Sequence, residues 1–172
     1  MIFNGPDIRW VGNESGYARE SEWSVVNSNG SLFGIVNCTA KDLGSLQALR
    51  DGDRLVWYPA ETDVSIRPGW FYHAREDNKV KSVEQLLDIY FSSVGYNSVL
   101  LLNLPPDRRG LIHENDVQRL HEFRKVLDAI FDESLAAGAR ATASHVKGDN
   151  PAFAADKITD GDSQTYWTTD DW

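Results

Sequence analysis

Cysteine and positive charge are scarce in this sequence. The single cysteine, Cys38, has no partner for a disulfide within the chain, so cysteine usage is no evidence for or against an oxidising compartment. The 17 lysines and arginines are outnumbered by 26 aspartates and glutamates, which gives a formal net charge of -9. No basic cluster offsets this charge, so binding to nucleic acid has no electrostatic basis.

Long apolar runs and common cofactor motifs are also missing. Runs such as Val99 to Leu102 are too short to span a bilayer, and residues 1–12 lack the basic start and apolar segment of a signal peptide. There is no glycine-rich phosphate loop, no cysteine and histidine cluster with metal spacing, and no Gly-x-Ser-x-Gly elbow. These absences argue against membrane insertion and against nucleotide, zinc and esterase chemistry, and we expect no metal ligands in the active site.

What is present, in the second half of the chain, is an alternation of strands and helices. A capping box of Ser82 and Gln85 opens a predicted helix that Gly95 ends with a left-handed residue. The apolar run over residues 98–104 predicts a strand buried on both faces. A second helix is expected to begin at a cap on Asn115. Its predicted inward stripe is Val117, Leu120, Phe123, Leu127, Ile130 and Phe131. This order predicts an α/β fold with a parallel sheet.

The first half of the chain is richer in loops. Short strands are expected over residues 1–3, 55–58 and 70–73, the last two of them buried, and a carboxylate-rich loop over residues 59–70. From Ala136 the sequence becomes small and polar and loses helical periodicity, which places a domain boundary between 1–134 and 135–172. The tail offers about two strand candidates. It stops without a closing element, so we expect it to be truncated.

The candidate chemistry lies in two loops that contain carboxylates. Glu14 stands among an arginine, aromatic residues and glycines in residues 9–17, and Glu61 stands in the loop over 59–70. Glycoside cleavage needs a proton donor and a second carboxylate, and these two residues provide such a pair only if their loops converge. Glu14 has an alternative role as a solvated loop acid, and Trp70 has one as a core aromatic. Arg9 and Arg67 have an alternative role as partners in surface ion pairs.

Three segments, residues 5–16, 61–72 and 95–107, resemble family 29 α-L-fucosidases in order and spacing. Together they span most of residues 1–131. The triplet Gly12-Asn13-Glu14 most resembles the subgroup that prefers α-1,3 and α-1,4 fucosyl branches. The resemblance implies that residues 1–134 are the C-terminal half of a (β/α)8-like barrel of a retaining hydrolase that acts on fucosylated oligosaccharides.

The resemblance also implies roles for individual residues. Glu14 matches the acid/base, whereas the family's aspartate nucleophile lies upstream of the segment that matches Met1, so we expect this chain alone to be inactive. The residues expected to shape the sugar pocket, with the Trp70 ring stacked on fucose, are Arg9, Trp10, Glu61, Arg67 and Trp70. Two alternatives are a carbohydrate-binding or scaffold protein that has lost catalysis, and a small α/β domain that is complete at this length.

The tail has a resemblance of its own. Residues 139–144, 154–162 and 165–167 are similar to the first third of a discoidin-type β-sandwich, the fold of family 32 carbohydrate-binding modules. Such modules often hold a structural calcium near an Asp-Gly turn like Asp160-Gly161, for which a plain turn is the alternative. The family and this appended module together imply a periplasmic or extracellular location.

Overall fold

The computed structural model describes residues 7–20, 22–27, 40–43, 45–52 and 55–170 of the 172-residue chain. The predicted strand over residues 1–3 and Cys38 lie outside these ranges. The chain forms two compact units, Met1–Arg124 and Lys125–Trp172. The domain boundary expected between residues 134 and 135 stays a prediction, and each unit is described by itself.

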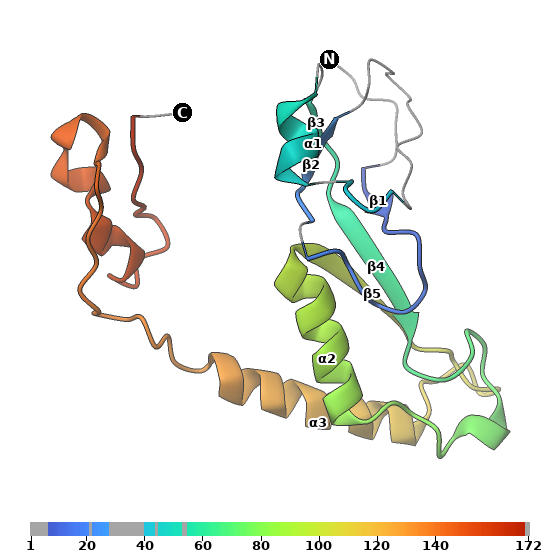
Figure 1. Ribbon diagram of the computed structural model, residues 1–172. Coiled ribbons are helices and arrows are strands. Elements are labelled where there is room, and N and C mark those ends of the chain that lie inside the picture. Colours follow the sequence, from blue (N-terminus) through green and yellow to red (C-terminus); the bar gives the residue numbers. More distant parts are fainter. Residues whose placement is uncertain (1–6, 21, 28–39, 44, 53–54, 171–172) are drawn as a thin grey trace. The chain divides into compact units, whose positions relative to one another are not determined.

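A three-stranded parallel sheet lies at the centre of the first unit (Figure 1). Its strands stand in the order β1 (Arg9–Trp10), β4 (Ala60–Ser65) and β5 (Ser98–Asn103). The β4 and β5 strands pair along their full length, from Ala60 opposite Ser98 to Ser65 opposite Asn103. The predicted α/β organisation and the predicted strand after residue 97 are confirmed.

The β4 strand corrects the prediction of a loop over residues 59–70. Ala60, Thr62 and Val64 are buried and alternate with the more exposed Glu61 and Asp63, which is the period of a strand with two unlike faces. The predicted strand over residues 70–73 does not form. Those residues belong instead to a connection that contains the short 3-10 helix η1 (Ala74–Glu76), because Pro68 and Gly69 favour a turn before the aromatic run.

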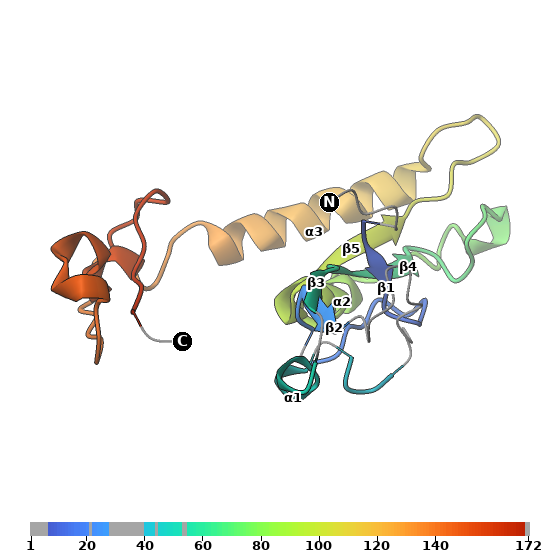
Figure 2. The same cartoon turned by 90° about the horizontal axis from the view of Figure 1, so that it is seen from above.

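Helix α2 (Val83–Ser93) covers one face of this sheet, as the two views in Figures 1 and 2 agree. It begins with the predicted capping box, since the Ser82 hydroxyl accepts the Gln85 amide hydrogen and the Gln85 side chain accepts that of Ser82. A 3-10 turn, η2 (Val94–Tyr96), follows. The left-handed residue is Asn97, with φ of 68°, and not Gly95, because the turn continues beyond the glycine.

The other face of the sheet is open in the described part of this chain. Partners in a parallel ladder share a face, so Trp10, Glu61 and Val99 lie side by side, followed by Asp63 and Leu101. On the opposite face, Gly16 of the loop after β1 lies between Val64 and Ile89 of helix α2, since a Cβ added there would lie 3.1 Å from Val64 and 2.8 Å from Ile89. In a (β/α) barrel the strand face turned away from the helices is the interior face.

A second, antiparallel pair of strands is formed by β2 (Val25–Asn27) and β3 (Leu55–Trp57), with the short helix α1 (Leu46–Arg50) close to β2. The strand predicted over residues 55–58 is therefore present. Its expected burial is wrong for this chain, because Trp57 is 73% exposed and Leu55 is also exposed. A two-stranded pair has only one neighbour for each strand, so outward side chains have little to cover them.

Helix α3 (Glu114–Phe131) is the second predicted helix. It begins at Glu114, two residues before the start that a cap on Asn115 implies, since the carbonyl of His113 accepts the Val117 amide hydrogen. Asn115 lies inside the helix and is not its cap. Within the predicted stripe only Phe123 is buried, and its ring contacts that of Tyr90 edge-on at 6.2 Å. None of the helices in the described ranges is long and apolar enough to cross a membrane.

The second unit contains 3-10 helices where strands were expected. These are η3 (Lys147–Asp149), η4 (Pro151–Phe153) and η5 (Ala155–Ile158), and no strand occurs in its described residues, 125–170. Isolated bonds such as Lys147 N–H to Thr168 O, 2.9 Å, hold the turns together. The expected start of a β-sandwich is thus not formed here. A strand is stabilised by hydrogen-bonded neighbours, and neither strand candidate has such a neighbour in the described residues of this stretch.

Candidate active site at the carboxyl edge of the parallel sheet

Glu14 and Trp70 meet at the carboxyl edge of the parallel sheet. Glu14 follows strand β1, Trp70 follows the neighbouring strand β4, and the Trp70 indole N–H donates to Glu14 Oε2 over 2.8 Å. The carboxylate is exposed and the indole half-buried, so the pair faces solvent. The structure thereby brings together the predicted acid/base and the residue predicted to stack on the sugar.

The loop that carries Glu14 is held by its own side chains. Asn13 accepts the Ser15 amide hydrogen and donates to the Tyr17 carbonyl over 2.9 Å, which closes a tight turn around Glu14. The Tyr17 hydroxyl donates to Asp88 of helix α2 over 2.8 Å, and this hydrogen bond is the main reason that the pKa of Tyr17 is raised. The position of Glu14 therefore depends on α2 as well as on β1.

Arg9 is buried and does not face the Glu14 carboxylate. Its guanidinium donates to the carbonyls of Tyr58 and Trp23 over 2.9 and 2.8 Å, and it forms an ion pair with the buried Glu22. Arg19 also bonds Glu22, over 3.0 Å. A buried charge must be paired to be tolerated, and this pairing ties strand β1 to the segment before β2. The predicted contact of Arg9 with sugar stays a prediction.

Trp10 and Glu61 lie next to each other on the open face of the sheet. The Trp10 indole N–H donates to Asp63 Oδ1 over 2.6 Å, so its ring is fixed over strand β4. Trp10 is 43% exposed, which leaves ring surface free to contact a ligand. The structure adds Asp63 to the candidate residues, and the alternation of polar and apolar residues over 60–64 is the signal that identifies it.

Arg67 lies at the base of the connection that carries Trp70. Its side chain is buried, with Nε donating to Asp116 Oδ2 and Nη1 to Asp77 Oδ1, each over 2.8 Å. The guanidinium carbon also lies 5.0 Å from the centre of the Tyr72 ring. The hydrogen bond from Arg67 holds the pKa of Asp77 below its ordinary 3.8, and the charge of His113 adds to the effect. Arg67 thus joins this connection to helix α3.

Asn103 is a site residue that sequence reasoning missed. It ends strand β5, and its side-chain amide donates to the Trp70 carbonyl over 3.0 Å. The available signal is a polar residue at the carboxyl end of a buried apolar strand, which is where barrel enzymes place functional side chains.

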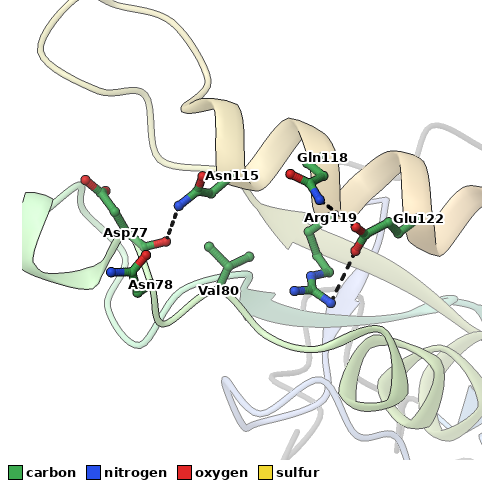
Figure 3. Close-up of a pocket in the computed structure, with 7 residues that line it drawn as sticks. All are labelled: Asp77, Asn78, Val80, Asn115, Gln118, Arg119 and Glu122. Atoms are coloured by element: carbon green, nitrogen blue, oxygen red, sulfur yellow. Dashed lines mark hydrogen bonds and ion pairs between the residues drawn. The ribbon is translucent and has the colours of Figure 1, made fainter.

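A pocket of about 220 Å³ lies away from this edge, between the 77–80 segment and helix α3 (Figure 3). Asn115 points across it and donates to the Asp77 carbonyl over 2.7 Å, while Glu122 accepts from Gln118 and pairs with Arg119. None of the predicted site residues lines the pocket. We therefore do not place the candidate active site there.

The Asp160-Gly161 segment forms a turn. Asp160 Oδ1 accepts the Asp162 amide hydrogen over 2.9 Å, and Asp160 Oδ2 accepts the Thr165 hydroxyl over 2.8 Å. These bonds, that from Asp162 above all, lower the pKa of Asp160. Both carboxylate oxygens are thus used inside the turn, and the described residues contain no group of three or more histidine, cysteine, aspartate or glutamate side chains placed to hold a metal. The described residues thus form the plain turn that was the alternative, and a calcium in a complete module stays a prediction.

Comparison with known proteins identifies the family, and the matches extend over nearly the whole chain. The family model described as alpha-L-fucosidase matches residues 17–129. Alpha-L-fucosidase 1 of Arabidopsis thaliana is 40% identical over 174 residues, which cover 99% of this chain and 33% of that protein. The chain thus spans about a third of the length of the curated relatives it matches.

Solved structures agree with this result. A Bacteroides thetaiotaomicron protein provisionally named an alpha-L-fucosidase is 43% identical, with a TM-score of 0.78 over 94% of this chain and 33% of that one. A family 29 fucosidase of Ruminococcus gnavus, solved in complex with fucose, is 32% identical, with a TM-score of 0.71 over 94% of this chain and 32% of its own. The chain belongs to the alpha-L-fucosidases of glycoside hydrolase family 29.

Proposed function

We propose that this chain contributes the acid/base side of the active site of a retaining exo-α-L-fucosidase. Glu14 would protonate the glycosidic oxygen as it leaves, and then take a proton from the water that cleaves the fucosyl-enzyme. The observation that carries the proposal is the hydrogen bond from Trp70 to the exposed Glu14 carboxylate at the carboxyl edge of the sheet. The fucose complex of the Ruminococcus gnavus relative supports the choice of sugar.

The remaining candidate residues divide into two groups in this proposal. Trp70, Trp10 and Glu61 face the site and contact the sugar, with Trp70 stacking on the ring of fucose. Arg9 and Arg67 support the segments that carry Glu14 and Trp70, because each guanidinium is buried and already bonded to carboxylates. The triplet Gly12-Asn13-Glu14 supports a preference for α-1,3 and α-1,4 linkages.

The second carboxylate of the mechanism is proposed to be an aspartate outside this chain, at the end of an earlier barrel strand. Retention requires a nucleophile about 5 to 5.5 Å from the acid/base carboxyl group. The purified 172-residue chain is therefore expected to release no nitrophenol from para-nitrophenyl α-L-fucoside. Measurable turnover that co-purifies with the chain contradicts this part of the proposal.

The test of Glu14 uses the longest protein that contains this sequence. Glu14→Ala is expected to lower kcat/KM on a fucosylated trisaccharide, which reports the step that releases the leaving group, by about 10²- to 10⁴-fold, the contribution of a positioned general acid. The loss should be smaller on para-nitrophenyl fucoside, because nitrophenolate leaves without protonation. Glu20→Ala removes an exposed glutamate from the same segment and is the matched control. Equal losses on both substrates, or an active Glu14→Ala protein, contradict the assignment of Glu14 as the acid/base.

The alternative is a carbohydrate-binding or scaffold protein derived from such an enzyme. It predicts that the longest protein binds fucose by calorimetry but does not hydrolyse either substrate, and that Glu14→Ala changes neither result. The exposed Glu14 carboxylate bonded to Trp70 favours the enzyme, since binding alone has no need for an acid at that position.

For residues 135–172 we propose the beginning of a discoidin-type carbohydrate-binding sandwich, on the strength of the sequence resemblance alone, and with it a periplasmic or extracellular location. The test is a protein extended beyond residue 172. Circular dichroism of a protein that begins at residue 135 and extends beyond residue 172 measures the result. A spectrum with β-structure supports the proposal, and a spectrum without it rejects the proposal.

A further inference from the structure

The side-chain amide of Asn103 joins two parts of the connection that carries Trp70. Its nitrogen donates to Ser65 Oγ and to the Trp70 carbonyl, both over 3.0 Å, so each of its two hydrogens has an acceptor. The Asn103 backbone carbonyl accepts the Ile66 amide hydrogen over 3.0 Å. The last residue of β5 therefore holds both the beginning of the connection and the residue that bonds Glu14.

The Ser65 hydroxyl completes this arrangement. It donates to the Gly69 carbonyl over 2.7 Å and accepts the Arg67 amide hydrogen over 3.3 Å, so the chain from Ser65 to Gly69 is closed into a tight turn. Ser65 is 5% exposed, which keeps water from competing for these bonds. The turn and the Asn103 amide together fix the backbone at Trp70, and the direction of its indole follows from that backbone.

A chain of contacts thus crosses the carboxyl ends of all three parallel strands. Asn103 at the end of β5 bonds Trp70 after β4, and Trp70 bonds Glu14 after β1. We propose that Asn103 is a positioning residue, whose amide holds the Trp70 backbone so that the indole N–H is directed at the Glu14 carboxylate. Its importance for catalysis rests on the proposed function, whereas the coupling from Asn103 to Glu14 is a property of this chain.

The experiment follows the Trp70 indole N–H of the 15N-labelled chain by NMR, with Trp70→Phe to assign its signal. In the parent protein, Glu14→Gln replaces a charged acceptor by a neutral one and should move this signal. In an Asn103→Asp background, where both donors are replaced by an acceptor, Glu14→Gln should move it by less than a third as much. The Trp10 indole, bonded to Asp63, reports whether the sheet is intact.

Asn97→Asp is the matched control at the other end of the same strand. The Asn97 amide also donates to a backbone carbonyl and a serine hydroxyl, those of Glu22 over 2.7 Å and Ser24 over 3.3 Å, but it does not touch the Trp70 connection. Its left-handed backbone is one that aspartate tolerates. With Asn97→Asp the response of Trp70 to Glu14→Gln should keep its parent size.

Each outcome decides the proposal. A response that survives in Asn103→Asp, or that is lost equally in Asn97→Asp, rejects it, as does a parent protein in which Glu14→Gln leaves Trp70 unmoved. Should Asn103→Asp lose the dispersed Trp10 signal, Asn103→Ala replaces it, since alanine introduces no charge. If both variants unfold the sheet, the role of Asn103 is general to folding and the proposal is rejected. The assay uses no substrate, so its failure is distinct from a failure of the proposed fucosidase activity.

Discussion

The indole nitrogen of Trp70 donates a 2.8 Å hydrogen bond to the carboxylate of Glu14, although 56 residues separate the two in the chain. Each residue follows the carboxyl end of its strand, and strands β1 and β4 are hydrogen-bonded neighbours. Parallel strands end at the same edge, so residues that follow adjacent strands meet. The bond supplies a fixed donor to Glu14, and its removal should therefore misdirect the proposed acid.

Replacing Trp70 by phenylalanine tests the importance of this donor. Phenylalanine keeps an aromatic face for the sugar and removes the N–H, so we expect KM to change little and kcat to fall about tenfold, equivalent to about 1.4 kcal/mol. This free energy is near the lower end of the range for a hydrogen bond to a charged group, because Trp70 and Glu14 are open to solvent. Steady-state kinetics on the longest protein that contains this sequence measure both values.

Trp167→Phe is the control for that substitution, since it removes an indole N–H bonded to the His145 carbonyl in the second unit. It should leave both kinetic constants unchanged. A rise in KM with unchanged kcat in Trp70→Phe would mean that the indole N–H serves sugar binding and not the orientation of Glu14.

The parts of the fold that local sequence determines were predictable. Helix α2 has its capping box and strand β5 its apolar run within a few residues, so both follow from nearby side chains. Strand β4 was mistaken for a loop because Glu61, Thr62 and Asp63 lie in an acidic run, and acidic residues are poor strand formers. Its two neighbouring strands, β1 and β5, override that preference, since each residue from Ala60 to Ser65 has a partner in β5.

The candidate site was only partly predictable, for a related reason. Glu14 was a candidate from the residues around it, whereas its role and that of Trp70 came from the resemblance, and no local pattern indicates that the two side chains bond. Asn103 acts on residues 33 and 38 positions away, which only the register of β5 against β4 brings close. The buried pairing of Arg67 with Asp116 was not predictable either, because the two residues lie 49 positions apart, and the sugar contact that the resemblance implies for Arg67 stays a prediction.

Removal of Asp116 should destabilise the first unit. The Asp116 and Arg67 side chains are both fully buried, so Asp116→Ala leaves a guanidinium without its principal partner. We expect a loss of about 3 kcal/mol in the free energy of unfolding, the lower end for a broken buried pair, because the half-buried Asp77 still neutralises part of the charge. Urea unfolding followed by fluorescence measures the loss. Glu122→Gln, which removes the partly exposed pair with Arg119, should change it by less than about 1 kcal/mol. Equal losses in the two variants would mean that burial adds nothing to this ion pair.

The lowered pKa of Asp77 predicts how stability depends on pH. Arg67 favours the ionised carboxyl in the folded state, so the folded pKa lies below the ordinary 3.8. The stabilisation is therefore fully present above pH 3.8 and is lost as the pH falls through the folded value. Asp77→Asn should be less stable than the parent at neutral pH, and the difference should shrink in acid. Urea midpoints measured across that range test the prediction, and a difference that stays constant with pH contradicts it.

Gly16 tests the packing of helix α2 against the sheet below the candidate site. Its φ of 79° is left-handed, and a Cβ there would lie 2.8 Å from Ile89 Cγ2 and 3.1 Å from Val64 Cγ1. Gly110 has a similar φ of 76°, but no atom lies within 4 Å of the position that a Cβ would take there. Gly110→Ala therefore incurs only the left-handed strain, roughly 1–2 kcal/mol. Gly16→Ala adds overpacking and should be less stable than Gly110→Ala by about 1–3 kcal/mol in urea unfolding. Equal losses would mean that Ile89 and Val64 move apart freely, in which case the loop of Glu14 is not held rigidly against α2.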